Sequence, residues 1–158
     1  MGGSGTPRRP QPPRADRAVH RRLLEGMGFE LIPLKNIANQ AAHLPDGVTV
    51  SVTCSPAGTI DDTLDLCATF TAAGHTTVPH VAARMVDGED HVDRIVARLT
   101  AQGIRRVFVI GGDAEQRGPF ADAAGFLRSF LDRQPPVDAV GIGAYPDGHP
   151  SIPDGVLV

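Results

Sequence analysis

Short apolar runs alternate with helical apolar stripes along most of this 158-residue chain, and this alternation constrains the fold more than any other feature. The predicted strands span residues 29–34, 48–53, 76–81, 106–110 and 138–142. Because a helix separates each strand from the next, neighbouring strands must be joined by right-handed crossovers and run parallel. The sequence therefore predicts an α/β fold built on a parallel sheet.

Three longer helices and one short helix are expected between these strands. The longer apolar stripes are Ile60, Leu64, Cys67 and Ala68; Val92, Ile95, Val96 and Leu99; and Phe120, Ala123, Ala124, Leu127 and Leu131. Thr59, followed by Asp62 three residues later, predicts a capping box, whereas Gly74 and Gly103 are typical of helix ends. A short helix is expected within residues 34–44.

Five strand–helix units fit either an open doubly wound sheet or part of a (β/α)8 TIM barrel. A complete barrel takes about 250 residues and eight strands, so we expect a partial barrel with about five of the eight β/α units. Residues 151–158 resemble the beginning of another helix with Asp154 as its cap, which favours a truncated barrel domain over residues 26–158. Two unpaired sheet edges would then predict poor solubility and little or no turnover.

Charge is distributed unevenly between the start of the chain and its body. Residues 1–25 hold six arginines against Asp16 and Glu25, a balance of +4, and the remaining residues hold nine basic against sixteen acidic groups, a balance of -7. The Pro, Gly and Arg content of residues 1–25 predicts a disordered basic leader. An acidic body with no Trp and one Tyr is a poor surface for nucleic acid.

Several compositional features bear on the compartment of the protein. No run of 18 or more apolar residues occurs, so no membrane span is expected, and residues 1–22 lack the apolar segment of a secretory signal. Cys54 and Cys67 form neither a CxxC motif nor a disulfide framework, so we interpret both as structural thiols. The sequence therefore predicts a cytoplasmic protein without membrane or nucleic-acid partners, and formation of a homo-oligomer stays open.

Polar residues follow the carboxyl ends of the predicted strands. They are Thr53, His80 with Arg84, Asp113 after Gly111 and Gly112, Tyr145 and His149. Parallel α/β architectures place their active sites at this edge, because the loops converge there. Standard phosphate-binding motifs are absent, since no GxGxxG opens a helix after a strand and no P-loop occurs.

Glu30 is the exception, because it lies inside the first strand between Phe29 and Leu31. If the carboxyl faces a packed interior, loss of hydration raises its pKa and suits it to general acid catalysis. If the first strand lies at the sheet edge, Glu30 is in water. Periodicity alone favours neither alternative. His80 is equally ambiguous, since a single strand histidine is more often a core group than a catalyst.

Four segments resemble one known enzyme family in both order and spacing. They are Phe-Glu-Leu-Ile-Pro at residues 29–33, Val-Ser-Val-Thr at 50–53, Pro-His at 79–80 and Tyr-Pro-Asp-Gly-His-Pro at 145–150. They are similar to the FE-x-x-P, VSVT, PH and YP-x-x-HP motifs on the first, second, third and fifth strands of methylenetetrahydrofolate reductase. The resemblance extends from Phe29 to the end of the chain.

The resemblance implies a (β/α)8 barrel that reduces 5,10-methylenetetrahydrofolate to 5-methyltetrahydrofolate, with NADH or NADPH as the reductant and usually with FAD. It assigns Glu30 as the acid that opens the five-membered ring of the folate. It also implies that Asp113 lies near the pterin and the flavin, as a catalytic, substrate-binding and cofactor-binding residue. Thr53, His80 and Tyr145 would line the flavin site, with Gly111 and Gly112 at the same cofactor.

One departure from the family bears on the flavin. Family members commonly have Arg-Gly-Asp where this chain has Gly111, Gly112 and Asp113. Loss of a fixed cation beside a phosphate-bearing cofactor costs about 1–3 kcal/mol. FAD is therefore expected to bind differently, or the nicotinamide acts directly.

Two other hypotheses stay open at the level of sequence. The first is a metal-dependent barrel hydrolase or lyase whose ion is held by His80, His149, Asp113 and Glu30, because these residue types suit a divalent metal. The second is a decayed, non-catalytic copy that keeps the same motifs.

Overall fold

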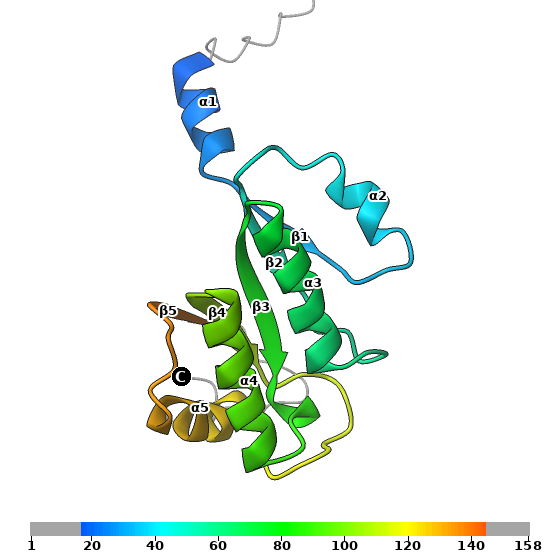
Figure 1. The fold of residues 1–158 in the computed structure, drawn as a ribbon, viewed down its shortest axis with the longest axis vertical. Coiled ribbons are helices and arrows are strands. Elements are labelled where there is room, and N and C mark those ends of the chain that lie inside the picture. Colours follow the sequence, from blue (N-terminus) through cyan, green and yellow to red (C-terminus); the bar gives the residue numbers. More distant parts are fainter. Residues whose placement is uncertain (1–16, 145–158) are drawn as a thin grey trace, which may run out of the picture.

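Five parallel strands form a single open sheet in the computed structural model, which describes residues 17–144. The strands are β1 (Gly28–Leu31), β2 (Thr49–Val52), β3 (Thr76–Ala82), β4 (Arg106–Ile110) and β5 (Ala139–Ile142). Their order across the sheet is β1-β2-β3-β4-β5, the same as their order in the chain (Figure 1). The predicted parallel α/β sheet is thus confirmed, and all five predicted strands are present.

The helices are α1 (Arg17–Glu25), α2 (Ile37–Ala41), α3 (Ile60–Ala72), α4 (Glu89–Gln102) and α5 (Ala123–Asp132), with a short 3-10 turn, η1, at Ala83–Met85. Helices α3, α4 and α5 follow the three predicted apolar stripes, and α2 lies within the expected residues 34–44, whereas α1 was not predicted. At the start of α3 the Thr59 hydroxyl accepts a hydrogen bond from the Asp62 N–H at 3.0 Å, and the Asp62 carboxylate accepts one from the Thr59 N–H at 2.9 Å. The predicted capping box is confirmed, and Gly103 ends α4 in the left-handed conformation.

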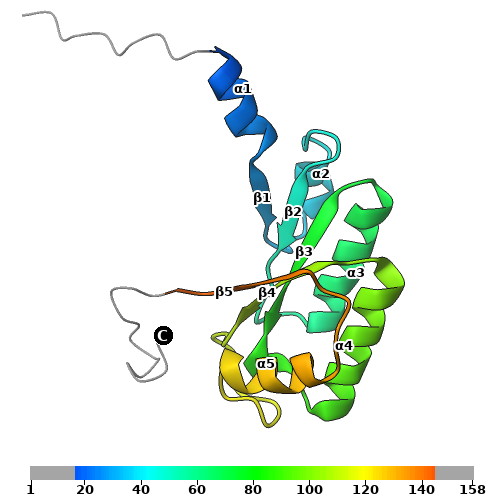
Figure 2. The same ribbon diagram turned by 90° about the vertical axis from the view of Figure 1, so that its left-hand side faces the viewer.

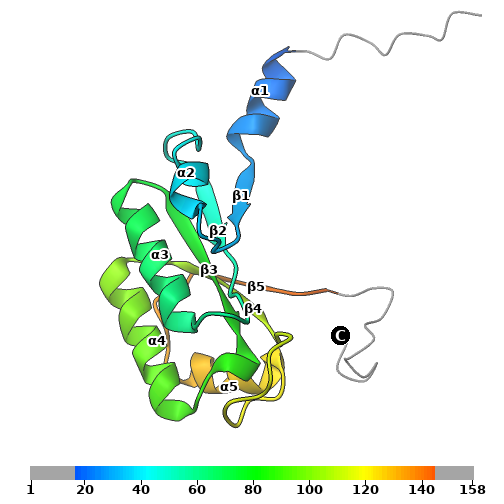
Figure 3. The ribbon, with the colours of Figure 1, turned by 90° about the vertical axis from the view of Figure 1, so that its right-hand side faces the viewer.

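The sheet is wound in one direction, as in a (β/α)8 barrel. A doubly wound sheet reverses its strand order part-way, whereas here each new strand is added at the same edge. Figures 2 and 3 show α3 and α4 side by side along one face of the sheet. The result is a partial, barrel-like α/β fold whose sheet is not closed, because β1 and β5 are the two end strands and do not pair with each other.

The hydrophobic core lies between the sheet and this helical layer. Because paired residues of parallel strands point to the same face, the register places the following strand residues on the helical side: Leu31, Val50, Val52, Val81, Val107 and Val109. All six are buried. They pack in one cluster with Leu64, Cys67, Ile95 and Phe126 of the helices. Within residues 17–144, no helix forms such a layer on the other face of the sheet (Figures 2 and 3).

The helices are joined by ion pairs that the apolar pattern does not reveal. Arg98 of α4 forms salt bridges with Asp61 and Asp65 of α3. Arg133, just after α5, does the same with Glu89 and Asp93 of α4, which are exposed. A single surface ion pair contributes little to the free energy of unfolding. These pairs join α3 to α4, and α4 to the end of α5, so each helix is linked to the next.

Helix α1 occupies part of the predicted disordered leader, so the structure differs from that expectation for residues 17–25. None of its residues is buried, and Val19, Leu23 and Leu24 are exposed. The ribbon shows α1 projecting from the sheet (Figure 1). Spacing alone could have indicated this helix, because Val19, Leu23 and Leu24 lie on one helical face. The rest of the leader lies outside the described residues.

None of the helices in the described part of the chain is both long enough and apolar enough to cross a lipid bilayer.

His91, in the first turn of α4, is a buried titratable group inside the helical layer. Its Nδ1 accepts a hydrogen bond from the Asp87 N–H at 3.1 Å, and its Nε2 has no hydrogen-bond partner. The Asp61 carboxylate lies 3.8 Å from Nε2. Burial lowers the pKa of His91, with a smaller effect of the same sign from Arg94 and Arg117 and opposing effects from Asp87 and Asp61. The neutral ring is therefore the form that this packing favours.

Acidification is expected to destabilise the fold through His91. Because its folded pKa lies below the ordinary value of 6.5, its contribution to stability is complete above that value and is lost as the pH falls below it. We expect His91→Gln, which keeps an acceptor for the Asp87 N–H, to flatten the pH dependence of the free energy of unfolding. Urea unfolding at about pH 7.5 and about pH 5 measures this.

The matched control for this experiment is His43→Gln, since His43 is exposed. The slope in His43→Gln is the reference for a histidine replacement at the surface, and His80, whose pKa burial also lowers, contributes to the slope that remains in His91→Gln. An unchanged slope in His91→Gln would show that His91 does not titrate differently in the folded and unfolded chains.

Candidate active site on the open face of the sheet

The face of the sheet opposite the helices carries the residues that sequence analysis singled out on β1 and β3. Glu30, Ser51 and Val78 are paired in register across β1, β2 and β3. His80 lies two residues beyond Val78 on β3, so its side chain points to the same face. The sheet therefore gathers Glu30 and His80 on one face from strands that are far apart in the sequence.

Glu30 is exposed, so the alternative in which it faces a packed interior is wrong for the described chain. The physical reason is its position on β1, which among the described strands is an end strand paired with β2, on the face that none of the described helices covers. The alternative of an edge strand with Glu30 in water is the correct one. Burial was the reason for expecting the Glu30 carboxyl to hold its proton, and that reason does not apply to an exposed side chain.

His80, in contrast, is mostly buried, with 9% of its surface exposed. Burial lowers its pKa, and the negative charge of Glu30 acts in the opposite direction. The His80 imidazole is therefore biased towards its neutral form, which can both donate and accept a hydrogen bond. The effect of Glu30 also shows that its carboxylate is near enough to act on the charge of His80.

Two residues on this face were missed by sequence analysis. Phe108 of β4 is paired in register with His80, and their ring centroids are 4.8 Å apart with planes inclined by 33°. Gly141 of β5 is paired in register with Phe108 on its other side. No motif marks either residue, because the contact depends on which strands are neighbours. Only the strand register could have identified them.

Thr53 directly follows β2 at the carboxyl edge of the sheet. Its N–H and its hydroxyl both donate hydrogen bonds to the carbonyl of Leu31, at 3.0 Å and 3.3 Å. These bonds continue the pairing of β1 with β2 beyond the strands. The hydroxyl proton of Thr53 is therefore already used within the protein.

The loops after β3 and β4 are tied together at the same edge. The Arg84 N–H donates to the Gly111 carbonyl at 3.1 Å, and the Arg117 N–H donates to the Arg84 carbonyl at 2.8 Å. The Arg84 Nε donates to the Ala121 carbonyl at 2.9 Å. Arg84 thus contacts Gly111 through its backbone N–H, while its guanidinium is held on the Ala121 carbonyl. Asp113 is exposed in this loop and makes no hydrogen bond or ion pair with the other described residues.

Gly112 is required by the way these loops pack. Its φ is +86°, a conformation that residues with a side chain rarely adopt. A Cβ there would also lie 2.8 Å from the Cβ of Ala82, which is buried at the end of β3. Neighbouring Gly111 has no atom within 4 Å of the corresponding position.

Substitution at these two glycines should therefore have unequal effects. We expect Gly112→Ala to lower the free energy of unfolding by about 1–3 kcal/mol, from the backbone strain and the collision with Ala82. Gly111→Ala, the matched control, should change it by much less. Chemical denaturation of both variants measures this, and equal losses would show that the loop adjusts without cost.

Two of the predicted site residues, Tyr145 and His149, lie outside the described residues. The metal-site hypothesis consequently has only Glu30, His80 and Asp113 in the described part of the chain. Within residues 17–144, no group of three or more His, Cys, Asp and Glu side chains is arranged to hold a metal ion. No observation on the described residues favours this alternative.

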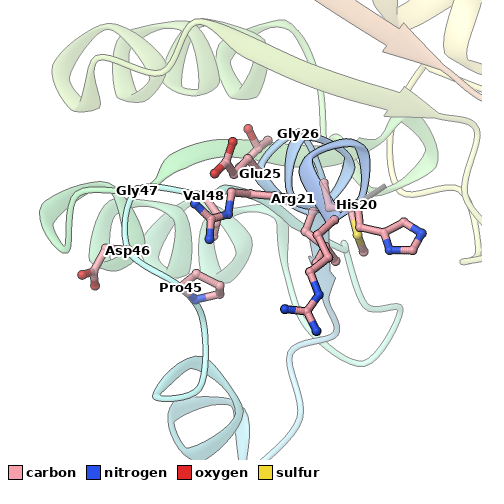
Figure 4. Close-up of a pocket in the computed structure, with 12 residues that line it drawn as sticks. His20, Arg21, Glu25, Gly26, Pro45, Asp46, Gly47 and Val48 are labelled. Atoms are coloured by element: carbon pink, nitrogen blue, oxygen red, sulfur yellow. The ribbon is translucent and has the colours of Figure 1, made fainter. Parts of the chain in front are cut away.

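A hollow of about 570 Å³ lies at the opposite end of the sheet, between α1 and the segment that enters β2. Figure 4 shows His20, Arg21 and Glu25 of α1 on one wall and Asp46 and Val48 on the other. It adjoins the amino ends of β1 and β2, whereas parallel sheets carry their active sites at the carboxyl ends. We therefore do not assign it to the catalytic site.

A comparison of the chain with models of known protein families finds no match. The expected likeness to methylenetetrahydrofolate reductase therefore depends on the sequence motifs alone, and the motif at residues 145–150 lies outside the described residues.

The described residues do not by themselves fit FAD. Gly111 offers no side chain to a phosphate, and the hydroxyl proton of Thr53 is donated to Leu31. The guanidinium of Arg84 already uses its Nε on Ala121. We consequently assign no chemical step to a flavin.

Proposed function

We propose that this chain provides the first five strands of a methylenetetrahydrofolate reductase-like site. The reaction would reduce 5,10-methylenetetrahydrofolate to 5-methyltetrahydrofolate, with NADH or NADPH as the reductant. One observation carries the proposal: Glu30 and His80 lie on the same open face of a barrel-like sheet. They belong to two motifs about 50 residues apart in the sequence and to strands that are not adjacent.

In the proposed chemistry Glu30 supplies the proton. As the bond between the methylene carbon and one ring nitrogen of the folate breaks, that nitrogen takes the proton and the remaining iminium accepts a hydride at the methylene carbon. One proton and one hydride are consumed, and NAD(P)H leaves as NAD(P)⁺. Neutral His80 would hold the substrate by hydrogen bonds rather than transfer the proton, since burial lowers its pKa.

The exposure of Glu30 adds a condition to this proposal. A general acid works best when its carboxyl is shielded from water. The open face of the described sheet does not provide that shielding, so in the proposed reaction the bound folate itself covers Glu30. A cytoplasmic location is part of the same proposal, and it is supported by Cys54 and Cys67, both buried and unpaired.

Replacement of Glu30 tests this function most directly. Glu30→Gln keeps the size and the hydrogen-bonding edge of the side chain but removes the proton. The unpaired sheet edges predict little turnover even in the wild-type chain. We therefore expect the residual rate of NAD(P)H oxidation that depends on methylenetetrahydrofolate to be lost in Glu30→Gln, because a general acid usually contributes about 10²- to 10⁴-fold. Binding of 5-methyltetrahydrofolate, measured by calorimetry on the full chain, should weaken much less.

The matched control is Glu25→Gln, which removes an exposed carboxylate of α1 away from the open face. It should leave both rate and binding unchanged. A wild-type chain that binds neither the folate nor NAD(P)H would refute the proposal, as would a Glu30→Gln variant that turns over at the wild-type rate.

A further inference from the structure

The three aligned residues His80, Phe108 and Gly141 form a row across β3, β4 and β5 on the open face. Within residues 17–144 the imidazole of His80 has no hydrogen-bond partner that would fix its orientation. Its specific side-chain contact is the ring of Phe108, at a centroid distance of 4.8 Å. Aromatic rings at this distance and inclination attract each other beyond simple area burial. Within residues 17–144 the Phe108 ring is therefore the neighbour that can orient the His80 imidazole.

The ring of Phe108 can lie there only because residue 141 has no side chain. A Cβ on Gly141 would stand 2.5 Å from Cδ2 and 3.1 Å from Cε2 of Phe108. The first distance is well inside van der Waals contact, so an added methyl group must displace the ring. Gly141 does not have a positive φ, so its backbone conformation does not require a glycine at this position. The space occupied by the Phe108 ring does require one.

We propose that Phe108 is a positioning residue of the candidate site, which holds the His80 imidazole on the open face, and that Gly141 provides the space this requires. The proposal deepens the proposed function, because it takes His80 to be the residue that binds the ring of the substrate. A neutral imidazole in a fixed plane offers one donor and one acceptor at set positions. It would suit a planar heteroaromatic ring that carries both groups on one edge.

The test follows the His80 ring directly, by NMR titration of its imidazole protons in the full-length chain, with the resonances assigned by their loss in His80→Gln. Phe108→Leu removes the aromatic ring, Phe108→Tyr keeps it, and Gly141→Ala pushes it aside. Phe108→Leu and Gly141→Ala should remove the ring-current shift of the His80 protons. Both should also let water reach the imidazole and raise its pKa towards the ordinary value of 6.5. Phe108→Tyr should restore wild-type values.

Two controls separate positioning from general damage. Phe29→Leu removes a ring from β1 on the helical side of the sheet, and Gly88→Ala adds a methyl group where no atom lies within 4 Å. Neither should move the His80 resonances. Wild-type shifts and pKa of His80 in both Phe108→Leu and Gly141→Ala, in chains that retain native circular dichroism, would overturn the proposal.

This readout does not depend on substrate. If the folate does not bind, the proposed function fails while the titration still reports whether Phe108 positions His80. If the folate binds but the titration is unchanged in the variants, the positioning proposal alone fails. Should Phe108→Leu not fold, Gly141→Ala and Phe108→Tyr decide the question between them.

Discussion

Parallel pairing on both sides of β3 is the constraint on which the rest of the structure depends. This seven-residue strand pairs with β2 through its first half and with β4 through its second half. Consecutive strands are neighbours. Because crossovers between parallel strands are right-handed in nearly all proteins, successive helices such as α3, α4 and α5 are carried to the same face. The helices bury one side of the sheet, so the other side is left for polar residues. The strand order, which places these helices on one face of the sheet, thus determines on which face the candidate site lies.

The elements that local sequence determines were predicted well. The strands have β-branched runs of their own, and the capping box of α3 lies within four residues, so the information for both is contiguous. The arrangement of the candidate site was predicted only in part. Thr53, Gly111 and Gly112 follow their strands as expected, but the burial of Glu30 depends on whether another strand lies beside β1. Periodicity within one strand carries no information about its neighbours.

The same reasoning explains the features that sequence analysis missed. The contact of Phe108 with His80 joins residues 28 positions apart in the chain and exists only because β3 and β4 pair in one particular register. His91 is buried where α4 packs against another element, and the Asp61 carboxylate of α3 lies 3.8 Å from its Nε2. Helix α1 was overlooked for a different reason, since the charge and proline content of the leader as a whole concealed a local apolar stripe.

The close approach of Phe108 to Gly141 has a consequence for how this sheet could change over evolutionary time. The two positions share one volume, so they should vary together in related sequences: a bulky aromatic residue on the fourth strand with glycine on the fifth, or a small residue on the fourth with a larger one on the fifth. A substitution at Phe108 or at Gly141 alone would lower the stability of the fold. Complementary substitutions at both positions would recover part of that loss, so the effects of the two single substitutions on the free energy of unfolding would not be additive. A glycine that looks interchangeable in the sequence is thereby tied to the identity of a residue 33 positions before it.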